Sequence, residues 1–102
     1  MTTAKTTKTA EVVKESKFLK EEKYTAEASG IEYTFQFPGT KAVQELLDSS
    51  KNSYGNVVDT AYNEKLMEKI IVAPQTNWDY WDENNGYVEV MHAADKFLGN
   101  LL

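Results

Sequence analysis

Apolar and polar residues alternate along residues 24–37, and this period of two predicts a β-hairpin. The alternation is strongest in its second half, where one face of a strand would carry Ile31, Tyr33, Phe35 and Phe37. Ser29-Gly30 separates the two halves, and a glycine supplies the positive φ that a two-residue hairpin turn needs. Pro38 then ends the second strand, because proline has no N–H to donate to a neighbouring strand.

Three later segments change to the helical period. We expect helices over about residues 41–50, 59–72 and 86–99. The last has the strongest signal, since its apolar residues form one stripe over four turns: Tyr87, Val90, Met91, Ala94, Phe97, Leu98 and Leu101. Glu89 lies in the first turn of that helix, where a carboxylate interacts favourably with the helix dipole. The predicted fold class is α+β and mainly helical, with an N-terminal β-hairpin followed by three helices.

Composition divides the chain into two parts. Residues 1–16 are rich in Thr and Lys and poor in apolar residues, so we expect a flexible arm. Residues 17–102 contain no internal repeat and no linker, and we expect them to form a single α+β domain. The absence of cysteine from the chain excludes thiolate catalysis and thiolate zinc sites. No secretory signal is expected at the N-terminus, because its lysines are not followed by an apolar stretch.

The charge of the chain argues against two classes of partner. Residues 24–102 carry five lysines against twelve acidic residues, a balance of −7, and the chain contains no arginine. Nucleic-acid binding depends on positive charge and commonly on arginine, so no nucleic acid is expected as a partner. No apolar run reaches the roughly 18–20 residues that span a bilayer, so no membrane partner is expected either.

Candidate catalytic and metal-binding residues are few. His92 is the only histidine, it lies off the apolar stripe of its helix, and no second histidine or cysteine accompanies it. Asp79, Asp82 and Glu83 are close in sequence, but no register of this stretch matches the ligand positions of an EF-hand loop. A small helical body also offers little cleft for a catalytic carboxylate pair. We therefore expect a protein that is not an enzyme and uses no cofactor or metal.

The stretch NWDYWDENNGYVEV, residues 77–90, places Trp78, Tyr80 and Trp81 among acidic residues. These aromatics could fill the gap between the second and third helices, because a buried aromatic side chain contributes about 2–3 kcal/mol. They could instead anchor a partner, since Trp and Tyr are enriched at interface hot spots. Burial in the core is the preferred interpretation, with one or two of the three left partly exposed.

An ordered series of short signals over residues 31–98 resembles the tail assembly chaperones of long-tailed bacteriophages, in the version found in phages of Gram-positive bacteria. It comprises an aromatic strand that enters Pro38-Gly39, a helix with Asp48 near its end and a Tyr-Gly loop. A helix leading to Val-x-Pro, an aromatic–acid pair and a final helix ending in Phe-Leu follow, in the run YNEKLMEKIIVAPQTNWDYWDENNGYVEVMHAADKFL. The Lys/Thr arm lies outside the resemblance.

The resemblance implies a non-enzymatic role in phage morphogenesis. Such chaperones bind the long, apolar and largely helical tape measure protein, keep it soluble and help to recruit subunits of the major tail (tube) protein. The resemblance also implies that the protein acts in the host cell cytoplasm and is not expected in the mature virion. Many members are made in two lengths by ribosomal frameshifting, and a chain that ends just after its last helix is consistent with the shorter form.

We hypothesise that a partner contacts the last expected helix, the segment that carries Trp78 and Trp81, or both. The candidate partner-binding residues are Trp78, Tyr87, Met91, Phe97 and Leu98. Of the two tryptophans, Trp81 occupies the aromatic position of the resembled pattern and is expected to be buried, which leaves Trp78 as the more exposed contact. The same apolar stripe could instead be covered by a second copy of the chain, so a homo-oligomer is a competing use.

Two alternatives belong to other functional classes. A small acidic interaction or inhibitor protein could mimic nucleic acid and act on a host protein, as the −7 balance would allow. The interspersed Lys65, Lys69 and Lys96 weaken that interpretation, because a mimic needs a continuous anionic surface. A carbohydrate-binding domain would rest only on Trp78 and Trp81.

Overall fold

The computed structural model describes residues 16–102, so the predicted arm lies outside the described residues except for its last residue. The chain forms strands β1 (Glu21–Thr25) and β2 (Glu32–Gln36), then helices α2 (Thr40–Ser49) and α3 (Asp59–Lys65). A π-helical turn η1 (Leu66–Ile70) and strand β3 (Ile71–Ala73) follow, and helices α4 (Trp78–Glu83) and α5 (Tyr87–Leu101) complete the fold. The predicted class, a mixed and mainly helical α+β fold, is confirmed.

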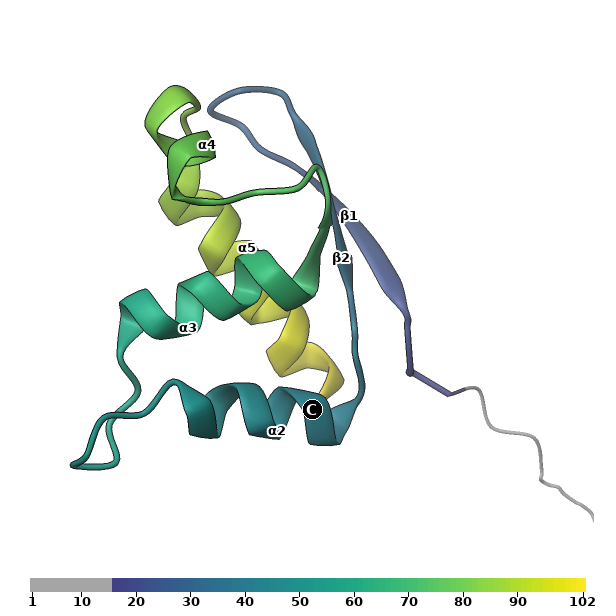
Figure 1. The fold of residues 1–102 in the computed structure, drawn as a ribbon. Helices are drawn as coiled ribbons and strands as arrows, with labels where there is room; N and C mark the ends of the chain where they lie inside the picture. Colours follow the sequence, from purple (N-terminus) through teal and green to yellow (C-terminus); the bar gives the residue numbers. More distant parts are fainter. Residues whose placement is uncertain (1–15) are drawn as a thin grey trace, which may run out of the picture.

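β2 is the central strand of a three-stranded antiparallel sheet with the order β1-β2-β3. The side chains of Tyr33 and Phe35 on one face of β2, and of Phe37 directly after the strand, are fully buried, as the alternating pattern predicts. The opposite face carries Glu32, Thr34 and Gln36, which are exposed or half-buried. One face of the sheet is therefore solvent-exposed, and the helices pack on its other face (Figure 1).

The hydrophobic core forms where α5 crosses this apolar face. Phe97 of α5 packs on Phe35 with ring centroids 5.7 Å apart, while Tyr24 of β1 stacks on Phe35 at 6.3 Å. The buried apolar residues come from β2, from positions directly after β1 and β2, and from α2, η1, β3 and α5: Ala26, Tyr33, Phe35, Phe37, Val43, Leu46, Leu66, Met67, Ile70, Ile71, Val90, Met91, Ala94, Phe97 and Leu98.

The predicted hairpin over residues 24–37 is present, but its start and its turn differ. Strand pairing begins at Glu21, which faces Gln36, and ends where Thr25 faces Glu32. The amide of Ala26 then donates to the carbonyl of Ile31 at 2.9 Å, so the loop holds four residues instead of the two expected. Gly30 does have a positive φ of 75°. Two amides of this loop donate hydrogen bonds to a side chain of α5 that is described below.

The helix predicted over residues 59–72 is shorter than expected. α3 passes directly into η1, whose wider turn brings Leu66, Met67 and Ile70 into the core. From Ile71 the backbone is extended and pairs with β2, where Phe35 faces Ile71 and Thr34 faces Ala73. Sequence periodicity missed β3 because three apolar residues cannot be distinguished from the end of a helix. Pairing with β2 satisfies backbone groups on the side of that strand that β1 leaves open.

The predicted helix over 41–50 is confirmed as α2, within one residue at each end. The predicted helix over 86–99 is α5, which begins after Gly86 and continues through Gly99 to Leu101. Leu101 is half-buried against the core, and its carbonyl accepts a hydrogen bond from the ammonium group of Lys17.

The sequence pattern does not predict the short helix α4, which lies between the expected helices over residues 59–72 and 86–99. The side chain of Asn77 caps α4 by accepting a hydrogen bond from the amide of Tyr80 at 2.8 Å. Asp79 adds a carboxylate to the first turn, where it interacts favourably with the helix dipole. These two residues were the available sequence signals for a helix start.

The burial of Leu98 leads to a stability prediction. Leu98→Ala should lower the free energy of unfolding by about 2–5 kcal/mol, because it removes buried methyl groups and leaves a cavity. Urea unfolding followed by circular dichroism measures the change. The matched control is Val88→Ala on the exposed side of the same helix, which should change it by less than about 0.5 kcal/mol. Equal effects of the two substitutions would contradict this packing of α5.

Candidate partner-binding site

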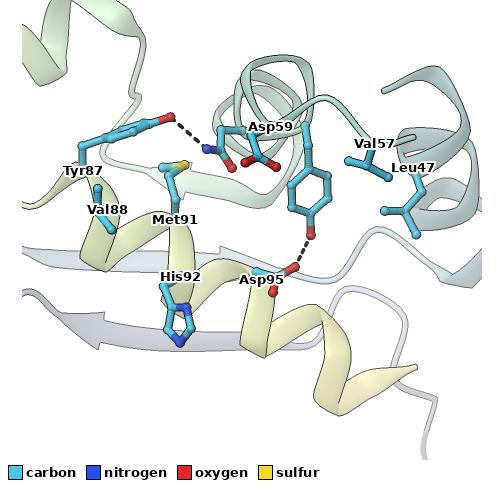
Figure 2. A pocket seen from close by; sticks show the side chains of 10 residues that line it. Leu47, Val57, Asp59, Tyr87, Val88, Met91, His92 and Asp95 are labelled. Carbon is cyan, nitrogen blue, oxygen red and sulfur yellow. Dashed lines mark hydrogen bonds between the residues drawn. The ribbon is translucent and has the colours of Figure 1, made fainter. Parts of the chain in front are cut away.

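A groove lies between α3 and α5 and is lined by no residue of the sheet (Figure 2). Its volume is about 560 Å³, and we call it the α3–α5 groove. The residues that line it come from α2, the loop after α2, α3 and α5: Leu47, Val57, Asp59, Tyr62, Asn63, Tyr87, Val88, Met91, His92 and Asp95. Figure 2 shows Leu47 and Val57 at one end and Tyr87 and Val88 towards the other.

Two hydrogen bonds across the groove fix the distance between its walls. Tyr62 of α3 donates its hydroxyl hydrogen to a carboxylate oxygen of Asp95 on α5 at 2.6 Å (Figure 2). The next residue of α3, Asn63, donates its side-chain amide hydrogen to the hydroxyl oxygen of Tyr87, about two turns before Asp95 on α5, at 2.8 Å. Burial, with a further contribution from the bond to Asp95, raises the pKa of Tyr62 well above its usual range, so this hydroxyl stays protonated at neutral pH.

The aromatic residues of α4 close the Tyr87 end of this region. Trp81 is half-buried, with its ring 5.7 Å from that of Tyr33 and 5.9 Å from that of Tyr87. Its indole N–H donates to the sulfur of Met67 at 3.2 Å. Tyr80 shares a hydroxyl–hydroxyl hydrogen bond of 2.7 Å with Tyr33, whose pKa is raised by burial and by that bond. Tyr80 and Trp81 therefore pack against the core without being fully buried, whereas the preferred interpretation placed at least one of the three aromatics inside it.

Trp78 is the outermost member of this aromatic group. Its side chain is 38% exposed, its ring lies 5.7 Å from that of Tyr87, and its indole N–H donates to Glu64 at 2.9 Å. The expectation that Trp81 would be the more buried tryptophan is confirmed. Trp78 therefore places an accessible indole beside one end of the α3–α5 groove.

The five predicted partner-binding residues separate into two groups. Trp78 and Tyr87 lie at the surface or partly buried, and Tyr87 lines the groove together with the floor residue Met91. Phe97 and Leu98 are buried in the core and point towards the sheet and η1, so in this fold neither side chain is accessible to a partner. Met91 is likewise almost entirely buried. A charged substitution at these three positions would disturb folding before it tested binding.

Sequence reasoning missed the two apolar side chains that are most accessible around the groove. Val88 on α5 is 75% exposed, and Val57 in the loop before α3 is 42% exposed. The signal for Val88 was present in the sequence, because it is a β-branched apolar residue on the polar side of an amphipathic helix. Val57 carried no comparable signal, since its position depends on how the 51–58 loop folds back towards α5.

The charge around the groove is negative. Of the residues that line it, Asp59 and Asp95 are acidic and none is a lysine. Within residues 16–102 the ion pairs join Lys23 to Glu32 and Lys51 to Asp48, and neither involves these two aspartates. His92 is exposed at the rim, as its position off the apolar stripe predicted. The groove thus presents apolar side chains towards its two ends and the carboxylates of Asp59 and Asp95 between them (Figure 2).

Glu89 fixes the start of α5, and with it the Val88 side of the groove, against the hairpin. Its carboxylate accepts hydrogen bonds from the hydroxyl of Tyr24 at 2.6 Å and from the amides of Glu27 and Ala28 at 2.6 and 3.3 Å. The bond from Tyr24, and then the amide bonds, lower the pKa of Glu89. The same contact raises the pKa of Tyr24 to about 12. Its favourable place in the first turn was expected, but its contact with the hairpin loop was not.

Other kinds of site find no support in the part of the chain that the structure describes. Within residues 16–102, no three His, Asp or Glu side chains gather in a way that could hold a metal ion. None of the described helices combines the length and apolar character needed to cross a bilayer. The comparisons with known proteins add no assignment, because no family model, curated protein or solved structure matches this chain.

The contacts of Glu89 lead to a pH prediction. Because folding lowers the pKa of Glu89, its contribution to stability should be complete above the unfolded pKa near 4.5 and lost as pH falls through the folded pKa. Glu89→Gln should therefore lower the thermal midpoint at pH 7 and flatten its decline between about pH 5 and pH 3. Scanning calorimetry over this range measures both effects.

The matched control for this prediction is Glu83→Gln, which neutralises an exposed carboxylate at the end of α4. The control should keep the wild-type thermal midpoint and its decline in acid. If Glu89→Gln and Glu83→Gln have the same pH profile, the hairpin contact of Glu89 makes no contribution to stability.

Proposed function

We propose that this protein is a tail assembly chaperone that binds a tape measure protein and helps to recruit tail tube subunits during phage tail morphogenesis. The observation that carries the proposal is the α3–α5 groove, which presents accessible apolar side chains on an acidic domain. The resemblance of residues 31–98 to tail assembly chaperones supplies the identity of the client. On this proposal the protein acts in the host cell cytoplasm and leaves before the virion is complete.

The chemistry of the surface suits such a client. A long apolar helical protein aggregates unless its apolar stripe is covered, and a groove between two helices is a common way to cover one. Val57, Val88 and the indole of Trp78 are available for this contact without unfolding the core. The excess of acidic residues keeps the complex soluble while the apolar surfaces are joined. No catalytic step is required for this role.

The alternative of an acidic inhibitor that mimics nucleic acid has weaker support. Asp79, Asp82 and Glu83 are exposed on α4, but the same molecule places Lys65 and Lys69 around a second hollow beside α2. A mimic needs a continuous anionic surface, and the apolar groove would have no part in such a role. The chaperone proposal uses both the charge and the groove.

Co-expression tests the proposed function. The tape measure protein of the same phage should shift from the insoluble to the soluble fraction by several-fold when this chain is present, and the two should co-purify. Quantitative immunoblotting of both fractions measures the shift. An unrelated acidic domain of similar size, expressed at the same level, is the control. An insoluble tape measure protein that fails to co-purify would contradict the proposal, as would finding this chain in purified virions.

A further inference from the structure

The α3–α5 groove is lined by apolar residues and by two carboxylates, those of Asp59 and Asp95. Asp95 accepts the Tyr62 hydroxyl with one oxygen, Oδ1, and Figure 2 shows both Asp95 and Asp59 beside the apolar residues of the groove. No salt bridge among residues 16–102 involves either carboxylate. The site therefore has both apolar surface and negative charge to offer to one ligand.

From this arrangement we propose that the groove binds one amphipathic helix of a partner protein and selects a helix whose apolar stripe is flanked by lysine or arginine. This inference rests on the proposed function and specifies which segments of the client are bound. The apolar stripe would pack between Val57 and Val88 over Met91, while the basic flank would meet Asp59 and Asp95. An acidic helix with the same stripe would be rejected by charge.

The exposed rim of the groove favours a helix over a small molecule. The volume of about 560 Å³ accommodates several side chains of a helix, spaced at i, i+3, i+4 and i+7. Val88 is 75% exposed at the rim, so the ligand must extend beyond the groove to cover it. The hydrogen bonds of Tyr62 and Asn63 hold the two walls in place before a partner arrives, which reduces the ordering cost of binding.

Charge complementarity argues for a basic flank instead of a neutral one. The lining has two carboxylates and no lysine, and the domain around it carries an excess of acidic residues. Like charges placed opposite each other at an interface suppress wrong partners, and opposite charges accelerate encounter. A chaperone with this groove would therefore bind the basic amphipathic segments of a long helical client and pass over its acidic ones.

Titration with designed helical peptides tests the proposal directly. The first peptide has 18 residues, leucines at i, i+3, i+4 and i+7, and lysines beside the stripe. A second replaces these lysines with glutamates, and a third keeps the composition of the first but breaks the stripe. Isothermal titration calorimetry with the full chain should give at least tenfold tighter binding for the first than for either other peptide. The difference between the first two should shrink in 0.5 M salt.

Variants assign the binding to the groove. Asp59→Asn with Asp95→Asn keeps the acceptor for Tyr62 and should reduce the preference for the basic over the acidic peptide to below about threefold. The matched control is Asp79→Asn with Asp82→Asn, which removes the same charge from exposed positions on α4 and should leave the preference unchanged. Val88→Asp should weaken the basic peptide at least tenfold, because its unpaired carboxylate would be covered by the apolar stripe at a cost that exceeds its attraction for the lysines, whereas Val72→Asp on an exposed position of β3 should not.

The outcomes that overturn the proposal are distinct. The first is that the stripe-broken peptide binds as tightly as the first peptide, and the second is that the Asp59/Asp95 variant keeps the preference for the basic over the acidic peptide. The third is that the wild-type chain is a dimer and Val88→Asp converts it to a monomer, which would make a second copy of the chain the occupant of the groove. If Val88→Asp still solubilises the tape measure protein, the groove proposal is wrong and the chaperone proposal stands. If the peptides bind as expected but the tape measure protein is never solubilised, the proposed function fails and the groove specificity stands.

Discussion

Tyr33, Phe35 and Phe37 are fully buried on one face of β2, and the other elements are arranged so that this face is covered. β1 and β3 satisfy the two edges of the strand, α5 packs its Phe97 on Phe35, and α4 brings Trp81 over Tyr33. Three large aromatics on one short strand expose too much apolar surface for a lone hairpin to be stable in water. The sheet is therefore stable only when the helices cover its apolar face, and that face in turn determines where the helices pack.

The two sides of α5 follow from that arrangement. One side is committed to the core through Val90, Ala94, Phe97 and Leu98, while Tyr87, Val88 and Asp95 face α3 or the solvent. Because α5 is held at its start by Glu89 and along its length by the bonds from Tyr62 and Asn63, its outer side forms a fixed wall. An apolar groove on a rigid wall can bind a helix without a large ordering cost, and this property links the fold to the proposed chaperone role.

Hydrogen bonds of polar side chains connect elements that are distant in sequence. Glu89 links the last helix to the hairpin loop, and Asp95 and Tyr87 link it to α3. The bonds of Asp95 and Tyr87 cross the groove, and the buried residues of the core are almost entirely apolar. Such an arrangement lets the surface residues specify orientation while apolar burial supplies most of the stability.

The sequence by itself determined the strongest periodic elements: the alternating strand β2, α2 and the long apolar stripe of α5. It also indicated that Trp81 lies deeper than Trp78 and that His92 is exposed. Periodicity works for these elements because each buries a continuous face of its own. Tertiary structure decided the rest, including the four-residue hairpin loop, the conversion of residues 71–73 into a strand and the groove lined by Val57 and Val88. These features depend on contacts between residues far apart in the chain, such as Glu89 with Glu27 and Ile71 with Phe35, and no local pattern specifies such contacts.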